Sequence, residues 1–153
     1  MMTEVKKVLF LCTGNSARSQ MAEGLLNHLS HGRWEVRSAG IFPSNVHPLA
    51  IRVIGEIGID ISKQTSKSID QFAKEKFDYI ITLCDEAAQS CPAFPGRGKR
   101  LHWPLEDPAA AIGTMEEKLV VFRRVRDEIK RKIEEFLKSE FSEFPDPIAS
   151  FKF

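Results

Sequence analysis

Two residues of complementary chemistry, Cys12 and Arg18, frame a polar loop of five residues. A cysteine thiolate is a strong nucleophile, and the planar guanidinium of an arginine can bind two oxygens of a tetrahedral oxyanion at once. Gly14 and Asn15 inside the loop tolerate the positive φ that a tight cradle around an anion needs. We therefore predict that Cys12 attacks an oxyanion held by the residues Thr13, Gly14, Asn15, Ser16, Ala17 and Arg18.

The elements on either side of this loop place it where anions bind. An apolar run over residues 5–11 predicts a buried strand, and apolar residues at helical spacing predict a helix over 19–31. The first N–H groups of a helix lack intrahelical partners and lie at its positive end, so they stabilise an anion or a thiolate. Ser19 is placed to hydrogen-bond the sulfur of Cys12. The alternative is a buried cysteine followed by an ordinary helix start; the residues inside the loop favour the nucleophile.

The remaining chain alternates strands and helices. Strands are expected over 34–39, 77–83 and 101–103, and helices over 48–57 and 116–138. This alternation predicts a flavodoxin-like α/β fold in three layers, with a four-stranded parallel sheet of order 2-1-3-4 and helices on both faces. Residues 1–138 form one domain in this interpretation, and residues 139–153 form a flexible C-terminal tail that carries several phenylalanines.

The overall charge is nearly balanced. Lysine and arginine number 22 and aspartate and glutamate 21, which leaves a formal net charge of +1. Surfaces that bind nucleic acids or anionic membranes need clustered excess cations, so this balance argues against both partners. The apolar runs are too short to span a bilayer, and the first residues show no signal-peptide pattern. We expect a cytoplasmic monomer.

The chain has three cysteines, Cys12, Cys84 and Cys91, which are too few and odd in number for a secreted disulfide scaffold. Cys84 follows the predicted strand 77–83, so it emerges at the same edge of the sheet as Cys12. A hydrolase needs one thiolate, whereas a reductase supplies two electrons by converting two thiols into a disulfide. We favour such a redox relay. The alternatives are that Cys84 is a small buried apolar residue and Cys91 incidental, or that both ligate zinc together with His102.

The segment between the second and third cysteines favours a helix over residues 85–90, because two acidic residues occupy its first turn and two alanines follow. Pro92 forbids its extension. Positions seven apart on a helix are separated by about 10 Å along the axis, from a rise of ~1.5 Å per residue, whereas a disulfide needs Cα atoms within roughly 7 Å. A Cys84–Cys91 disulfide therefore requires the segment to unwind, which costs little in so short a helix.

A candidate general acid, Asp107, follows the last predicted strand of the sheet. Attack by Cys12 on a tetrahedral centre expels an oxygen, and a carboxylic acid that protonates this oxygen lowers the barrier. Loops that follow parallel strands meet at the carboxyl edge, beside Cys12. The alternative is that Asp107 and Pro108 form only a turn. The same dipeptide recurs at Asp146, but it lies in the predicted tail and we assign it no role.

The sequence from Cys12 to Glu23 resembles the active-site loop of the low-molecular-weight protein tyrosine phosphatase superfamily. This superfamily includes phosphatases and thioredoxin-coupled arsenate reductases. Residues 34–40 and 106–108 also match, so the resemblance covers roughly residues 5–138. Either branch of the superfamily implies that Cys12 is the nucleophile, that Arg18 binds the oxyanion and that Asp107 is the general acid.

The region around Cys84 and Cys91 resembles the arsenate reductase branch, and alanines follow Asp107-Pro108 where phosphatases of the superfamily carry tyrosines. This branch implies that Cys12 binds arsenate, that Cys84 attacks the adduct and releases arsenite, and that Cys91 resolves the resulting disulfide. Thioredoxin is then the reductant, and phosphate and sulfate are substrate analogues. The alternatives are a low-molecular-weight phosphatase that hydrolyses aryl phosphates through a Cys12 phosphoenzyme, and a non-catalytic thiol redox sensor.

Some reductases of the superfamily hold a potassium ion beside the loop. The resemblance places its ligands at Asn15, Glu23, Ser38 and Thr65, but Lys67 stands where a further carboxylate is expected. A lysine there repels a cation and is able to substitute for it. We therefore expect no tightly bound cofactor.

Overall fold

The structure is a computed structural model that describes residues 5–90, 94–96 and 98–143 of the 153-residue chain. Cys91 and the tail from residue 144 onward lie outside the described residues, so the predictions that concern them are not examined by it. The elements in chain order are β1 (Lys6–Cys12), α1 (Arg18–Leu29), β2 (Trp34–Gly40), α2 (Pro48–Gly55), η1 (Ile69–Phe72), β3 (Tyr79–Thr82), α3 (Asp85–Ser90), β4 (Lys99–His102), η2 (Pro108–Ala110) and α4 (Met115–Glu143).

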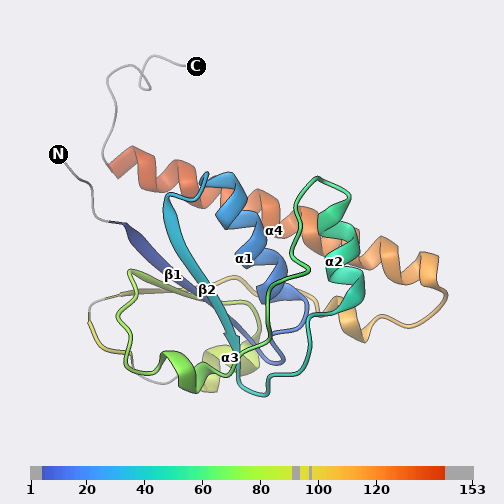
Figure 1. Cartoon of the computed structure of the whole chain (residues 1–153), viewed down its shortest axis with the longest axis horizontal. Helices are drawn as coiled ribbons and strands as arrows, with labels where there is room; N and C mark the ends of the chain where they lie inside the picture. Colours follow the sequence, from blue (N-terminus) through green and yellow to red (C-terminus); the bar gives the residue numbers. More distant parts are fainter. Residues whose placement is uncertain (1–4, 91–93, 97, 144–153) are drawn as a thin grey trace, which may run out of the picture.

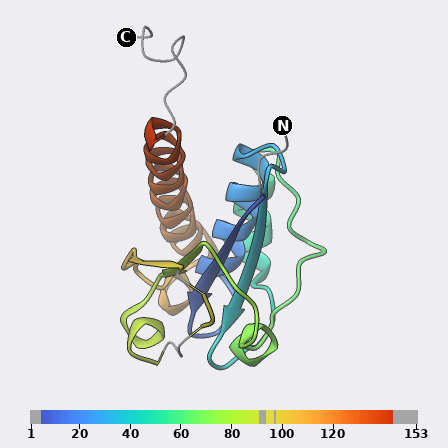
Figure 2. The same cartoon turned by 90° about the vertical axis from the view of Figure 1, so that its left-hand side faces the viewer.

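The described strands form one four-stranded sheet of order β2-β1-β3-β4, and every neighbouring pair is parallel. The predicted fold class and strand order are therefore confirmed. In the register of β1 and β2, Cys12 lies opposite Gly40, and Leu11 lies opposite Thr82 of β3. The carboxyl ends of these strands consequently meet at one edge, at the arrowheads in Figure 2. The nucleophile loop and the loop that follows β3 both start there.

Helices cover both faces of the sheet. Helices α1 and α2 lie against each other and against the long α4 (Figure 1), and α1 also contacts β1 and β2. The core on this face includes an aromatic cluster in which Phe136 of α4 contacts Trp34, Tyr79 and Trp103. Helix α3 contacts β1 and β3. A pocket lined by Ile80 and Thr82 of β3 and Ala88 of α3 shows that α3 covers the opposite face.

The boundaries differ from the sequence prediction mainly at two places. The third strand is restricted to Tyr79–Thr82, although the apolar run begins at Phe77, because Phe77 packs edge-on against Phe72 and Phe94 before the strand pairing starts. Helix α4 continues past the predicted end at Lys138 as far as Glu143. Helical periodicity weakens there, but the backbone hydrogen bonds of an established helix propagate at little cost. The predicted helix over residues 85–90 is confirmed as α3.

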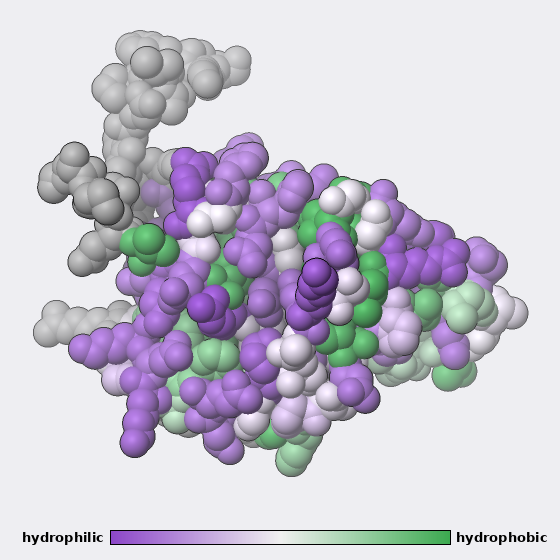
Figure 3. Space-filling view, in the orientation of Figure 1, coloured by the Kyte–Doolittle hydropathy of each residue, from purple (hydrophilic) through white to green (hydrophobic). Residues whose placement is uncertain are grey.

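Polar side chains cover most of the face seen in Figure 3, and the apolar ones form separate patches. Among the described residues, no helix is both long enough and apolar enough to cross a membrane.

Candidate active site

The loop after β1 forms a pocket at the carboxyl edge of the sheet. The pocket has a volume of about 200 Å³ and is lined by residues of the loop and of the segment after β4: Cys12, Thr13, Gly14, Ser16, Ala17, Arg18, Asp107 and Ala109. The structure thus brings the predicted nucleophile, oxyanion-binding residues and general acid to a single cavity.

The loop carbonyls point away from this pocket. Those of Thr13, Gly14 and Ser16 accept backbone hydrogen bonds from Phe42, Ser44 and His47 respectively, at 2.8, 3.1 and 2.9 Å. In a trans peptide the N–H and the C=O point in opposite directions, so the following N–H groups turn toward the pocket. Helix α1 begins at Arg18 without a side-chain cap, which leaves its first N–H groups to an anion.

A buried hydrogen-bond network holds the loop from behind. The hydroxyl of Ser19 lies 2.8 Å from the Cys12 sulfur, and Asn15 Nδ2 donates to the same hydroxyl at 2.7 Å. Asn15 is fully buried, adopts a φ of 47° and accepts a hydrogen bond from Gln20. The predicted contact between Ser19 and Cys12 is therefore present. The left-handed backbone at Asn15 explains the residue type at that position.

Arg18 and Asp107 face each other across the pocket. The Arg18 guanidinium is buried, donates to the Leu105 carbonyl at 3.1 Å and lies 3.7 Å from the Asp107 carboxylate. The Asp107 carboxylate also accepts from the Ala109 N–H at 3.0 Å and so caps η2. Asp107 is thus both the turn former and a carboxyl group beside the oxyanion site. The two interpretations of this residue are compatible.

The thiol of Cys84 lies beside the nucleophile loop. Its sulfur is 3.2 Å from the hydroxyl of Thr13, the residue after Cys12, and accepts from the Ala87 N–H at 3.3 Å. Cys12 and Cys84 are both buried free thiols. The predicted position of Cys84 next to the loop is therefore observed. A hydroxyl and an N–H in the first turn of α3 thus both contact the Cys84 sulfur.

His102 has a different role from the one that the zinc alternative requires. Its Nδ1 lies 2.8 Å from the Thr82 hydroxyl and its Nε2 lies 2.9 Å from the Asp85 carboxylate, so both ring nitrogens have partners. In the part of the chain that the structure describes, no group of three His, Cys, Asp or Glu side chains is arranged to hold a metal ion. His102 instead links β4 to the start of α3.

The residues that resemble potassium ligands converge behind the loop. Ser38 hydrogen-bonds Glu23, and the Thr65 carbonyl accepts from Lys67 Nζ at 2.5 Å. The same ammonium lies 3.8 Å from Glu23. Because a lysine ammonium already lies among these oxygens, the residues present do not fit a bound potassium ion in addition.

A sequence model of the low molecular weight phosphotyrosine protein phosphatases matches residues 7–143. This span contains the whole pocket and the four described strands except for the first residue of β1. The chain belongs to this family.

Several of the proteins that this chain resembles are arsenate reductases. The chain is 54% identical over 131 residues to an arsenate reductase of Halalkalibacterium halodurans. The alignment covers 86% of this chain and 94% of that protein. A solved arsenate reductase in the phosphate binding state superposes with a TM-score of 0.72 and 39% identity over 88% of this chain and 98% of the other. A thioredoxin-dependent arsenate reductase of Corynebacterium glutamicum superposes with a TM-score of 0.70 and 34% identity. The match covers 91% of this chain and 63% of the other.

Several residues that position this phosphatase-family site were missed by the sequence analysis. A Cβ at Gly40 would lie 2.7 Å from the Asn15 nitrogen and 2.7 Å from the Thr13 oxygen, so only glycine lets β2 end against the loop. Gln20 and the Leu105 carbonyl hold Asn15 and Arg18. A glycine at the end of a strand, such as Gly40, is a sequence signal for a site where another backbone approaches closely. Gln20 and Leu105 carry no signal, because they act through contacts that the folded chain creates.

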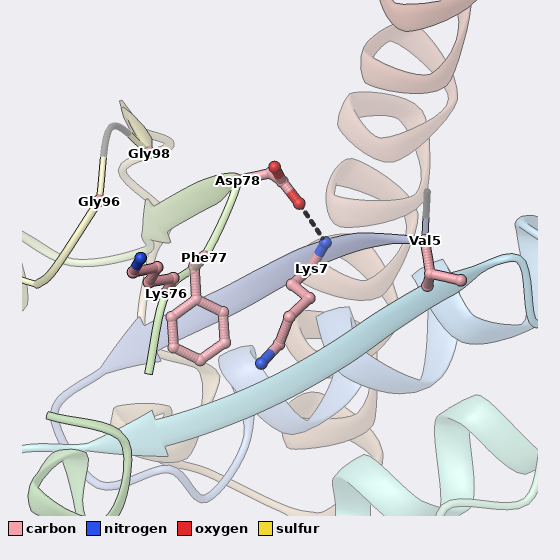
Figure 4. Close-up of a pocket in the computed structure, with 7 residues that line it drawn as sticks. All are labelled: Val5, Lys7, Lys76, Phe77, Asp78, Gly96 and Gly98. Carbon is pink, nitrogen blue, oxygen red and sulfur yellow. Dashed lines mark hydrogen bonds between the residues drawn. The ribbon is translucent and has the colours of Figure 1, made fainter. Parts of the chain in front are cut away.

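A larger cavity of about 330 Å³ lies at the opposite end of the sheet, where β1 begins (Figure 4). There the Lys7 N–H donates to the Asp78 carboxylate at 2.7 Å, and the Lys7 ammonium pairs with Glu35 and Glu75, each at 3.3 Å. The Lys7 ammonium and the Asp78 carboxylate at this cavity are thus engaged in structural contacts, and we assign it no chemistry.

Proposed function

We propose that this protein reduces arsenate to arsenite through a thiol–disulfide relay. The observation that carries the proposal is the Cys84 thiol beside the Thr13 hydroxyl, immediately next to the nucleophile loop. A phosphatase needs only Cys12, Arg18 and Asp107, and the second buried thiol has no place in hydrolysis. The curated arsenate reductase, similar over nearly its whole length, supports the same conclusion.

The first step is attack of the Cys12 thiolate on arsenic. The Arg18 guanidinium and the loop N–H groups bind the arsenate oxygens, and a new sulfur–arsenic bond replaces an arsenic–oxygen bond. Asp107 protonates the oxygen that leaves as water. Ser19 stabilises the thiolate before attack, because its hydroxyl lies against the sulfur. Arsenic remains in its pentavalent state in this adduct.

The second step transfers two electrons. The Cys84 thiolate attacks the Cys12 sulfur, a sulfur–sulfur bond forms and the sulfur–arsenic bond breaks. Its electron pair stays on arsenic, which leaves as arsenite, while the two thiols are oxidised to a disulfide. Cys91 then attacks Cys84 and releases Cys12 as a thiolate. The Cys84–Cys91 disulfide is reduced by a dithiol partner, for which the thioredoxin-dependent relative favours a thioredoxin.

Thioredoxin recycling is consistent with a reducing compartment, so we place the protein in the cytoplasm. We also propose that it acts as a monomer, since the pocket is completed by residues of a single chain.

Phosphate-ester hydrolysis is the second candidate, and the Cys12, Arg18 and Asp107 constellation favours it as a side activity. The deciding experiment measures arsenate-dependent NADPH oxidation with thioredoxin and its reductase present. We expect turnover by the wild type and its loss in Cys84→Ser and Cys91→Ser. Hydrolysis of p-nitrophenyl phosphate by the same two variants is the matched control and should stay within about twofold of the wild type. Equal loss of both activities would refute the relay.

A further inference from the structure

Lys67 places a positive charge inside the protein, behind the nucleophile loop. Its ammonium lies 2.5 Å from the Thr65 carbonyl and 3.8 Å from the Glu23 carboxylate. Only 16% of the Lys67 side chain and 13% of the Glu23 side chain are exposed. Glu23 additionally accepts a hydrogen bond from the Ser38 hydroxyl of β2. The ammonium therefore joins the segment after α2 to α1 and, through Glu23, to the sheet.

Each charge of this pair depends on the other. Burial raises the pKa of Glu23, while the Ser38 hydroxyl and the Lys67 ammonium act in the opposite direction. Burial lowers the pKa of Lys67, and the Glu23 carboxylate opposes this effect. Removal of Lys67 would leave the buried Glu23 carboxylate with the Ser38 hydroxyl and the weaker influence of Arg37 alone. Arg37 also lowers the pKa of Glu23, but its effect is smaller than that of Lys67, which is the cation paired with the carboxylate.

The backbone of Lys67 connects this ion pair to the nucleophile. The Lys67 N–H donates to Asn15 Oδ1 at 2.7 Å, and the Lys67 carbonyl accepts from the Gly40 N–H at 2.8 Å. From Asn15 the chain of hydrogen bonds continues to Ser19 and to the Cys12 sulfur. A side chain that fixes residue 67 consequently fixes the donor that holds Asn15 in its left-handed conformation.

We propose that Lys67 is a positioning residue whose ammonium acts as a built-in monovalent cation for the nucleophile loop. The ammonium carries the same unit charge as a potassium ion. Its N–H groups interact with a carboxylate and a backbone carbonyl, which are the kinds of oxygen that also bind potassium. An alkali ion and this ammonium exclude each other by charge and by space. The loop of this protein is therefore held without any free cation, and this property is independent of whether the substrate is arsenate or a phosphate ester.

The test compares Lys67→Ala with Lys63→Ala, which removes an exposed lysine of the same segment, in choline, sodium and potassium chloride at equal ionic strength. The two measurements are the melting temperature and the concentration of inorganic phosphate that protects Cys12 from iodoacetamide. For the wild type and for Lys63→Ala, we expect both values to be the same in all three salts.

In choline chloride, Lys67→Ala should melt roughly 4–8 °C lower than the wild type, because the Glu23 carboxylate loses its partner. Protection of Cys12 should then need roughly five- to tenfold more phosphate. Potassium chloride should restore much of both losses in this variant. The double variant Glu23→Gln/Lys67→Ala should not respond to potassium, because it lacks the carboxylate that attracts the ion.

Two results would overturn the proposal. One is a wild type that is stabilised by potassium relative to choline, which would mean that a cation binds in addition to the lysine. The other is a Lys67→Ala protein that matches Lys63→Ala or does not respond to potassium. The comparison of the wild type in the three salts tests the proposal even where Lys67→Ala does not fold.

Discussion

The two thiols of the site lie at the same edge of the sheet, where Cys84 contacts the residue after Cys12, but their surroundings differ. Cys12 precedes a loop in which Thr13 and Ser16 are half-buried, whereas Asn15 and Ser19 behind it are fully inaccessible and hydrogen-bonded to each other. Cys84 immediately precedes α3, a helix of six residues of which Asp85, Glu86, Ala88 and Gln89 are exposed. The nucleophile loop is anchored by the buried residues behind it, whereas α3 packs against the protein along one face only.

The contrast corresponds to the two tasks of the proposed reaction. Binding a tetrahedral oxyanion requires donors that are fixed before the substrate arrives, since reorganisation during the reaction costs free energy. Forming a disulfide across α3 requires the opposite, because a helix keeps its ends too far apart for the bond. A helix of six residues with few buried contacts opens at low cost. The difference in packing therefore separates substrate binding from electron transfer.

The largest effect is expected at the nucleophile itself. Cys12→Ser should lower both arsenate reduction and aryl phosphate hydrolysis by on the order of 10⁴-fold or more, because both start at this sulfur. Steady-state rates of the two reactions measure the effect. The matched change on the other region, Cys84→Ser, should leave hydrolysis nearly intact. A Cys12→Ser protein that still hydrolyses the ester would show that the loop is not the site.

A second variant tests how firmly the loop is held. Asn15→Ala removes an amide that bonds Ser19, Gln20 and the Lys67 N–H, and it places alanine at a positive φ. We expect a loss of about 2–4 kcal/mol in the free energy of unfolding, because buried donors lose their acceptor. Urea denaturation monitored by tryptophan fluorescence measures it. A loss below about 0.5 kcal/mol would mean that the network does not hold the loop.

Hydrogen exchange compares the two regions directly. In the oxidised protein, with the Cys84–Cys91 disulfide verified by mass, the amides of residues 85–90 should exchange at least about tenfold faster than in the reduced protein, because α3 has to unwind. The amides of α1 serve as the control and should exchange equally in both states. Equal exchange of residues 85–90 in the two states would contradict the unwinding mechanism.

The smallest effect is expected at the contact that holds α3 from outside. Asp85 is largely exposed where it meets His102 at 2.9 Å, so Asp85→Ala should cost no more than about 1 kcal/mol in the free energy of unfolding. The same denaturation assay measures this change. A cost as large as that of Asn15→Ala would show that α3 is fixed as firmly as the loop, and the comparison between the two regions would no longer hold.

Much of this molecule could be predicted from its sequence. The apolar run before Cys12 and the helical spacing after Arg18 define a strand–loop–helix junction, and the alternation of strands and helices predicts the parallel sheet. Parallel topology then brings the ends of β1, β3 and β4 to one edge, which suffices to place Cys12, Cys84 and Asp107 together. These conclusions follow from local periodicity and from a general rule of connectivity.

Only the tertiary structure decided how these residues are held. The contacts of Leu105 and Lys67 with the loop join residues far apart in the chain. Gln20 lies near Asn15 in the sequence, but nothing in the sequence marks the hydrogen bond between them. The resemblance placed Lys67 near the predicted potassium ligands, but only the fold shows that its ammonium lies 3.8 Å from the Glu23 carboxylate and is largely buried there. Periodicity reports which face of an element is buried, whereas the partner of a buried polar group is set by packing between elements. The chemistry of the site was therefore readable in the sequence, and its positioning was not.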